Sequence, residues 1–227
     1  MLKYKLLQYK LLRHTLKGLK PSSESGFNLI ESLVAIVLVA ILLVAIGPVI
    51  AYSVGTRVQA KRIELASQAA RTYADAVRAE SVDFNSIGTT KPSAVAAPST
   101  GTLTCNTSQK CTAPAESSGV HLYCVDFDGN GCTTDSLTDM VVQGISYRPS
   151  SASTTSGYCL GIRVYRANSF VGGTTLQTAA QDATSTNAIG NITLPLIQTT
   201  TEILPSGSDL RSVRTRIDAT TNNRTCD

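Results

Sequence analysis

One acidic side chain, Glu31, lies inside a long apolar stretch of the sequence. From Leu29 to Ile46 only Glu31 and Ser32 are polar. A carboxylate in a membrane-spanning segment is costly, and such residues usually mark a functional site with a charged partner. The alternative is that Glu31 lies at the membrane edge, where its side chain reaches water at little cost. Glu31 is therefore a candidate functional residue that needs a positively charged partner.

Oxygen-bearing side chains alternate along residues 126–131, which read Asp-Phe-Asp-Gly-Asn-Gly. Alternating oxygen ligands followed by a glycine resemble the first half of an EF-hand calcium loop. The glutamate that closes such a loop is missing, because Leu137 occupies its position. The alternative is an ordinary turn between two strands, clamped by Cys124 and Cys132. The expected ligands of a calcium ion are Asp126, Asp128, Asn130 and Asp135.

The chain has six cysteines, and all of them follow the apolar stretch. An even number of cysteines beyond a membrane segment predicts disulfides in an oxidising compartment. A zinc site is the alternative, but there is no C-x-x-C pair and His121 is the only histidine nearby. Six cysteines allow many pairings. We favour two pairs that close short loops and one that ties the C-terminus to a strand, namely Cys105–Cys111, Cys124–Cys132 and Cys159–Cys226.

Charge and motifs argue against nucleic-acid binding and against catalysis. The net charge of the chain is +4, but residues 1–26 hold six basic side chains and one acidic one. The remaining 201 residues carry 14 basic and 15 acidic side chains, so their net charge is close to zero. They lack the excess of basic side chains that is typical of a nucleic-acid-binding surface. The sequence has no P-loop, no G-x-S-x-G and no H-E-x-x-H motif, and only two histidines. These features favour a non-enzymatic role.

Three N-terminal segments precede the domain. Residues 1–26 form a basic leader, whose leucines predict an amphipathic helix on the inner membrane surface or an unordered cytoplasmic tail. Residues 27–52 form an apolar helix long enough to span a membrane. Residues 53–82 continue that helix with an apolar stripe at helical spacing. The basic leader predicts that the N-terminus stays in the cytoplasm and the C-terminal domain faces outward.

Residues 83–227 read as a small domain of strands and loops. The stretch 85–119 predicts a long loop with at most one short strand. In the strand with the clearest alternation, Leu160, Ile162 and Val164 face one way, while Arg163 and Arg166 carry charge. We expect an α+β fold, with a long N-terminal helix packed on a small antiparallel sheet. The predicted strands are 121–127, 140–148, 158–167, 192–198 and 212–219.

The residues around Gly26 resemble the processing site of type IV pilins and of the pseudopilins of type II secretion. Residues 26–33 read Gly-Phe-Asn-Leu-Ile-Glu-Ser-Leu, with asparagine where threonine is usual at the second mature position. Pro48, after Gly47, stands where many of these proteins carry a helix-loosening proline. The resemblance covers about the first 82 residues; beyond them only the plan of helix, variable loop and small sheet is similar. Stretches such as 32–37 look like cyanobacterial pseudopilins of hormogonium polysaccharide secretion.

This resemblance implies a route to function. A prepilin peptidase would cut after Gly26 and methylate the new amino group of Phe27. Glu31 of one subunit would pair with Phe27 of a neighbour, and Gly47 with Pro48 would break the helix. Some pseudopilins are similar in tying a surface loop with calcium. The implied partners are the peptidase, other pilin or pseudopilin subunits and an inner-membrane assembly platform.

The implied function is that of a pseudopilin or minor pilin in a pilus-like filament that serves secretion and motility. The narrower resemblance implies that the secreted material is polysaccharide. The chain would be a single-pass inner-membrane protein with a periplasmic or extracellular domain before it enters the filament. One alternative is a minor pilin of true type IV pili, serving twitching or DNA uptake. Another is a single-pass anchored binding module that never polymerises.

Overall fold

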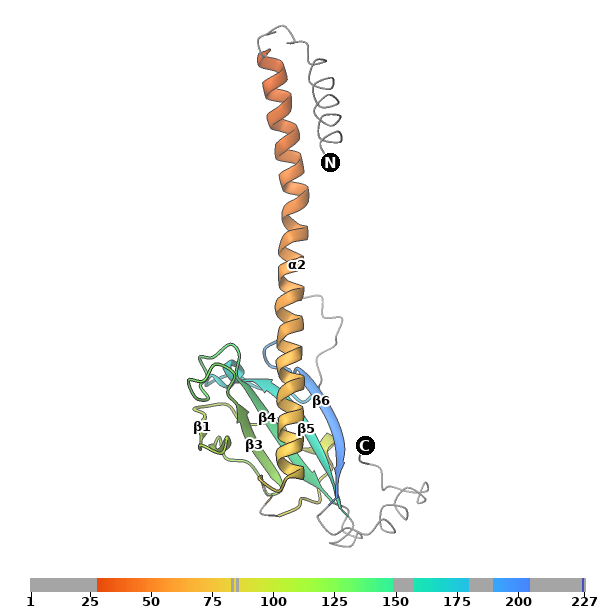
Figure 1. Cartoon of the computed structure of the whole chain (residues 1–227), viewed down its shortest axis with the longest axis vertical. Coiled ribbons are helices and arrows are strands. Elements are labelled where there is room, and N and C mark those ends of the chain that lie inside the picture. Colours follow the sequence, from red (N-terminus) through yellow and green to blue (C-terminus); the bar gives the residue numbers. More distant parts are fainter. Residues whose placement is uncertain are drawn as a thin grey trace, which may run out of the picture. The chain divides into compact units, whose positions relative to one another are not determined.

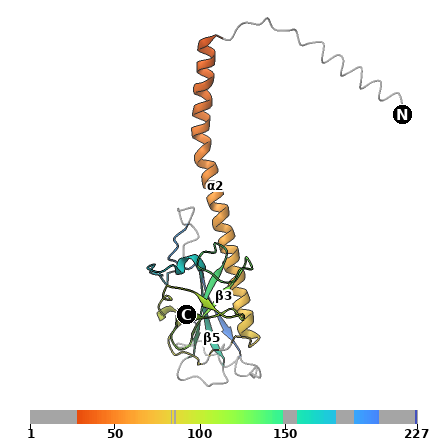
Figure 2. The same cartoon turned by 90° about the vertical axis from the view of Figure 1, so that its left-hand side faces the viewer.

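A long helix and a small antiparallel sheet make up the described part of the chain (Figures 1 and 2). The computed structural model forms two compact units, Met1–Ala51 and Tyr52–Asp227. The expected leader, the cleavage site at Gly26 and Phe27, and the strand predicted at 212–219 lie outside the described residues. The structure describes residues 28–82, 84, 86–148, 157–179, 190–204 and 226.

The helix, α2, runs from Leu29 to Arg78. The sequence predicted residues 27–82, so the helix ends four residues early. It ends because Glu80 adopts a left-handed conformation with φ of 56°. The backbone N–H and the hydroxyl of Ser81 then donate to the carbonyl of Ala76, at 3.0 and 2.8 Å, which satisfies a carbonyl left open at the helix end.

The expected helix break at Gly47 and Pro48 does not occur in the single chain, where α2 continues through both residues. Proline has no N–H, so one rung of the hydrogen-bond ladder is missing. The helix continues through Pro48 despite the missing hydrogen bond, because the turns on either side of it remain helical. A break that forms only between packed subunits stays a prediction.

The sheet has six antiparallel strands in the order β1-β2-β3-β4-β5-β6, so each strand pairs with its neighbours in the sequence. The α+β class predicted from the sequence is confirmed. The region predicted as a loop holds the two short strands β1 and β2, and the last described strand lies five residues later than predicted. The strands are β1 (Thr104–Cys105), β2 (Lys110–Ala113), β3 (Val120–Val125), β4 (Met140–Tyr147), β5 (Tyr158–Arg166) and β6 (Ile197–Ile203).

One face of the sheet packs against the second half of α2. The predicted apolar stripe covers residues 53–82, but its buried part begins at Leu65, and Val54 and Val58 are exposed. Tyr73 is fully buried at the centre of this contact, where a Cβ on Gly144 would lie 1.9 Å from its hydroxyl. Glycine is required at 144 for this reason. The helix side of the core contains Leu65, Ala66, Ala69, Ala70, Tyr73, Ala74 and Val77.

The other face of the sheet is also covered. A segment with the 3-10 helix η2 (Pro92–Ala94) and a second one, η3 (Ala167–Phe170), lie over it. Arg163 of β5 is only 1% exposed and donates from its guanidinium to the carbonyls of Pro92 and Val95, at 2.6 and 2.9 Å. The charged face of β5 predicted from the sequence is therefore buried.

Candidate functional site

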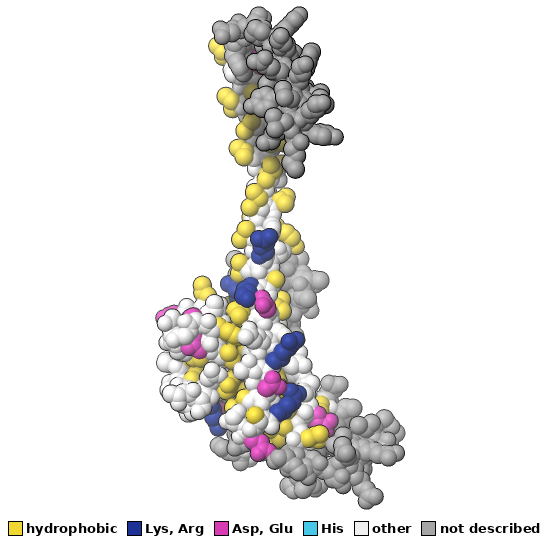
Figure 3. Space-filling view, in the orientation of Figure 1, with side chains coloured by type: hydrophobic (Ala, Val, Ile, Leu, Met, Phe, Trp, Pro, Cys, Tyr) yellow, Lys and Arg dark blue, Asp and Glu magenta, His cyan; other side chains and the backbone are white. Residues whose placement is uncertain are grey.

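The first part of α2 presents a continuous apolar surface. It contains an 18-residue window of mean hydropathy 3.2, none of it buried within the structure, and is long and apolar enough to span a membrane. Every large hydrophobic side chain from Leu29 to Val58 is exposed. Figure 3 shows hydrophobic side chains along this part of α2 and charged ones along its later part. An apolar surface of this extent needs a membrane or other apolar helices around it.

Glu31 lies in the first turn of α2 and is exposed. The helix begins at the carbonyl of Asn28, which accepts the backbone N–H groups of Glu31 and Ser32 at 2.8 and 3.2 Å. A carboxylate in the first turn interacts favourably with the unpaired N–H groups of a helix N-terminus. The structure thus places Glu31 at the N-terminal end of the helix. Its predicted partner, the amine of Phe27, lies outside the described residues.

The loop between β3 and β4 is organised around Asp126. One carboxylate oxygen accepts the backbone N–H groups of Asp128 and Gly129 at 3.0 and 2.7 Å, and the other accepts that of Gly131 at 2.8 Å. Gly131 has φ of 85°, a left-handed conformation that suits glycine. The amides of Gly131 and Gly129 hold the pKa of Asp126 below its usual value.

Two further aspartates join this loop. Asp139 is fully buried and accepts the backbone N–H groups of Phe127 and Thr133 at 3.1 and 3.4 Å. Burial raises the pKa of Asp139. Asp128 accepts the hydroxyl of Ser136 at 2.8 Å, and that same hydroxyl oxygen accepts the N–H of Asp139. Hydrogen bonds therefore connect the loop from one end to the other.

The carboxylates that converge are not quite those expected. Oxygen atoms of Asp126, Asp128 and Asp139 lie within 4.8 Å of one another, a spacing that would suit a hard cation such as calcium. Asp135 is exposed and does not belong to this group, and Asn130 contributes a backbone N–H to Asp128. Leu137 occupies the position that closes an EF-hand loop, whereas folding brings Asp139 close to Asp126 and Asp128.

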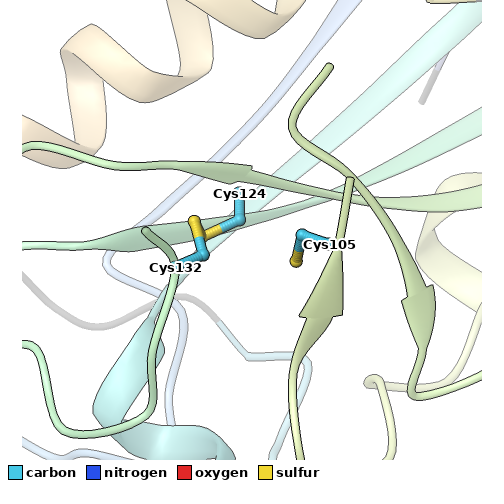
Figure 4. A group of neighbouring side chains, drawn as sticks. All are labelled: Cys105, Cys124 and Cys132. Carbon is cyan, nitrogen blue, oxygen red and sulfur yellow. A yellow bond between two sulfur atoms is a disulfide. The ribbon is translucent and has the colours of Figure 1, made fainter. Parts of the chain in front are cut away.

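All six cysteines form disulfides, as Cys105–Cys111, Cys124–Cys132 and Cys159–Cys226. These pairs coincide with those favoured from the sequence. Figure 4 shows Cys105 close to the Cys124–Cys132 bridge, and sulfur atoms of these three residues lie within 4.8 Å of one another. The sulfur atoms are bonded in pairs and are not thiolates, which are the form that binds zinc. The arrangement therefore supports the disulfide interpretation over the zinc one.

Comparisons of the chain with protein-family models, with curated proteins and with solved structures found no match. The described residues offer two features for a function. One is an exposed apolar helix with a carboxylate in its first turn. The other is an acidic loop fixed by its own hydrogen bonds and by the Cys124–Cys132 disulfide.

Proposed function

We propose that the chain is a subunit of a pilus-like filament, cut after Gly26 and assembled through α2. The observation that carries this proposal is the exposed apolar surface of Leu29–Val58, which bears a single carboxylate in its first turn. In a bilayer this surface faces lipid. In a filament the same surface packs against copies of itself, so one helix serves both environments.

Glu31 gives the assembly its register. Cleavage after Gly26 creates a positive amino group on Phe27, four residues before Glu31 in the same chain. In a filament core the amine of a neighbouring subunit compensates the carboxylate. Removing one partner of a buried ion pair costs about 3–5 kcal/mol, because the other charge stays buried without compensation. A helix that enters in the wrong axial register leaves Glu31 in apolar surroundings and is rejected.

The test compares Glu31→Ala with the matched control Glu64→Ala. Glu64 lies on the same helix, is exposed and pairs with Lys61 at 3.0 Å, so its loss costs little. We expect both variants to be cleaved and to reach the membrane. Glu64→Ala should be recovered in sheared filaments at the wild-type level, whereas Glu31→Ala should be nearly absent from them. Equal recovery of the two variants would contradict the proposed role of Glu31.

Cleavage is tested separately. Replacing Gly26 should block processing, and the uncut chain should keep its basic leader and stay in the membrane fraction. N-terminal sequencing of the wild-type protein should begin at Phe27, with a methylated amino group. A wild-type chain that begins at Met1 and never enters sheared filaments would favour the anchored binding module.

The narrower role we propose is that of a pseudopilin in polysaccharide secretion and motility, rather than a minor pilin of twitching pili. It rests on the resemblance of the N-terminal segment. Deleting the gene should abolish polysaccharide export and gliding while leaving twitching and DNA uptake intact. Co-purification with secretion components, and not with pilus components, is the expected biochemical result.

We expect Pro48 to loosen the helix only when the subunit is packed in a filament. In the single chain α2 is unbroken through this residue. Because Pro48 lacks one hydrogen bond, the turn before it is the place where the helix can stretch at least cost. We expect a filament map to show lost helical hydrogen bonds across residues 40–48. An unbroken helix there would contradict this part of the proposal.

A further inference from the structure

A groove lies between α2 and the edge strand β6. Its volume is about 470 Å³. The apolar lining includes Ala74 of the helix and Ile162 and Ile197 of the sheet, while Arg71 and Arg78 stand along the helix side. β6 is the last strand of the sheet, so the groove opens at an edge of the domain. The lining also includes Asp75 and polar residues, so the groove offers an apolar floor with charged and polar side chains along it.

The helix side of this groove carries two basic side chains, Arg71 and Arg78, and one acidic one, Asp75, so its net charge is +1. Arg78 donates to Asp75 at 3.0 Å and to the hydroxyl of Thr201 in β6 at 3.2 Å, so it bridges the two walls. Arg71 is exposed on the same helix face. Because Arg78 is already paired with Asp75, an incoming acidic group is attracted mainly to Arg71, which lies beside the apolar lining.

The matching feature is the β3–β4 loop. Residues 126–139 carry four aspartates and no basic side chain. Leu137 stands among them with 64% of its surface exposed, more than any other large hydrophobic side chain described after Leu65. Ser136, its neighbour, is held by hydrogen bonds to Asp128 and Asp139. Leu137 is thus an exposed apolar side chain on a loop fixed by its own hydrogen bonds, and the same loop exposes the carboxylates of Asp128 and Asp135.

We propose that the β3–β4 loop of one copy docks into the α2–β6 groove of a second copy, with Leu137 entering the groove. The contact joins two different surfaces of the same molecule, because β6 is the edge strand and the loop joins two inner strands. Figure 3 shows acidic side chains on the domain beside α2, and basic side chains interspersed with acidic ones along the later part of α2. A contact between unlike surfaces repeats without closing unless its rotation forms a ring, so it extends a filament. The inference rests on the proposed function and names a contact between its subunits.

Site-specific photo-crosslinking in the full chain tests the contact. Benzoylphenylalanine replaces Leu137, which is exposed, so the domain should fold as before. Illumination in membranes and in sheared filaments should give a dimer of the chain, with the crosslink in residues 67–78 or 197–201 of the second copy. The control carries the same group at Thr107, an exposed position between β1 and β2 at the opposite edge of the sheet. It should give no crosslink to the groove.

Charge reversal gives a second test that does not depend on the photo-crosslinker's size. Arg71→Glu and Asp135→Arg change exposed side chains at the two surfaces. Each alone should lower the recovery of the chain in filaments about two- to fivefold, as for an exposed ion pair. The double variant should recover toward the wild-type level. If the double variant is as poor as the sum of the single ones, the pairing is wrong.

The outcomes separate this inference from the proposed function. A chain that enters filaments but crosslinks from position 137 to another protein, or to no protein, overturns the docking and leaves the filament role intact. A crosslink to the groove in a chain that never enters sheared filaments supports the docking and contradicts the filament role. Crosslinking from position 137 within one chain alone also overturns the docking.

Discussion

Replacing Gly144 by alanine should loosen the contact between α2 and the sheet. A Cβ at position 144 would lie 1.9 Å from the hydroxyl oxygen of Tyr73, 2.3 Å from Cζ and 2.5 Å from Cε1. These distances are far inside van der Waals contact, and the atoms belong to a rigid ring. Tyr73 is fully buried, so the ring has no open space beside it. Either the helix moves away from the sheet or the ring leaves its place.

The expected cost is about 3 kcal/mol. Adding a methyl group to a packed core usually costs about 1–3 kcal/mol. The upper end applies because three ring atoms clash at once. For a domain of about 150–250 residues, 1 kcal/mol lowers the melting temperature by about 2–4 °C, which gives a decrease of about 6–12 °C.

Thermal unfolding of the full chain in detergent, followed by circular dichroism with the disulfides intact, measures this cost. The matched control is Gly172→Ala, since a Cβ at Gly172 meets no heavy atom within 4 Å. Its melting temperature should stay near the wild-type value. Adding Gly144→Ala to a Tyr73→Ala chain should cost little more, because the clashing ring is gone. Equal melting temperatures for Gly144→Ala and Gly172→Ala would refute the reasoning.

Three further predictions concern pH, disulfides and calcium. Burial lowers the pKa of His121 to about 4, so the unfolded chain binds the proton more tightly and stability falls as pH drops from about 6.5 to about 4. Because the side chain is only half-buried, we expect a loss of about 1–2 kcal/mol, which His121→Gln should remove from the pH dependence of unfolding. Replacing both Cys159 and Cys226 by serine opens a link across 67 residues and should cost about 4 kcal/mol in thermal unfolding. Millimolar calcium should raise the melting temperature, and Asp128→Asn should cancel the rise; an unchanged temperature in the wild-type chain would leave the loop an ordinary turn.

Periodicity predicts the long helix and the three central strands, but not where elements end. The apolar pattern of the helix continues to Val82, which is buried although it lies beyond the helix. The left-handed conformation of Glu80 ends α2, and side-chain pattern does not report backbone φ. β6 is rich in threonine and alternates weakly, so its place is set by pairing with β5. Tertiary pairing decides such bounds more than local preference does.

In the candidate site, too, some features can be predicted from the sequence and others arise only through folding. The position of Glu31 in an apolar run is visible in the sequence because it depends on composition alone. Asp139 becomes part of the acidic group only through folding, since it reaches Phe127 across the whole loop. Arg163 was expected on a charged face, but the η2 segment covers that face and supplies carbonyl oxygens. The alternation of polar and apolar residues along one strand does not show whether a second segment covers the polar face of the sheet.

The stability of the helix–sheet contact and the proposed docking are linked through Tyr73. Its neighbour Ala74 forms part of the groove, whose other wall is β6. If Gly144→Ala displaces Tyr73, it also shifts the helix wall of the groove relative to Ile197. We therefore expect this variant to crosslink from position 137 several-fold less than Gly172→Ala, at a temperature where circular dichroism shows both to be folded. Equal yields would mean that the groove keeps its shape when the ring moves, or that Leu137 docks elsewhere.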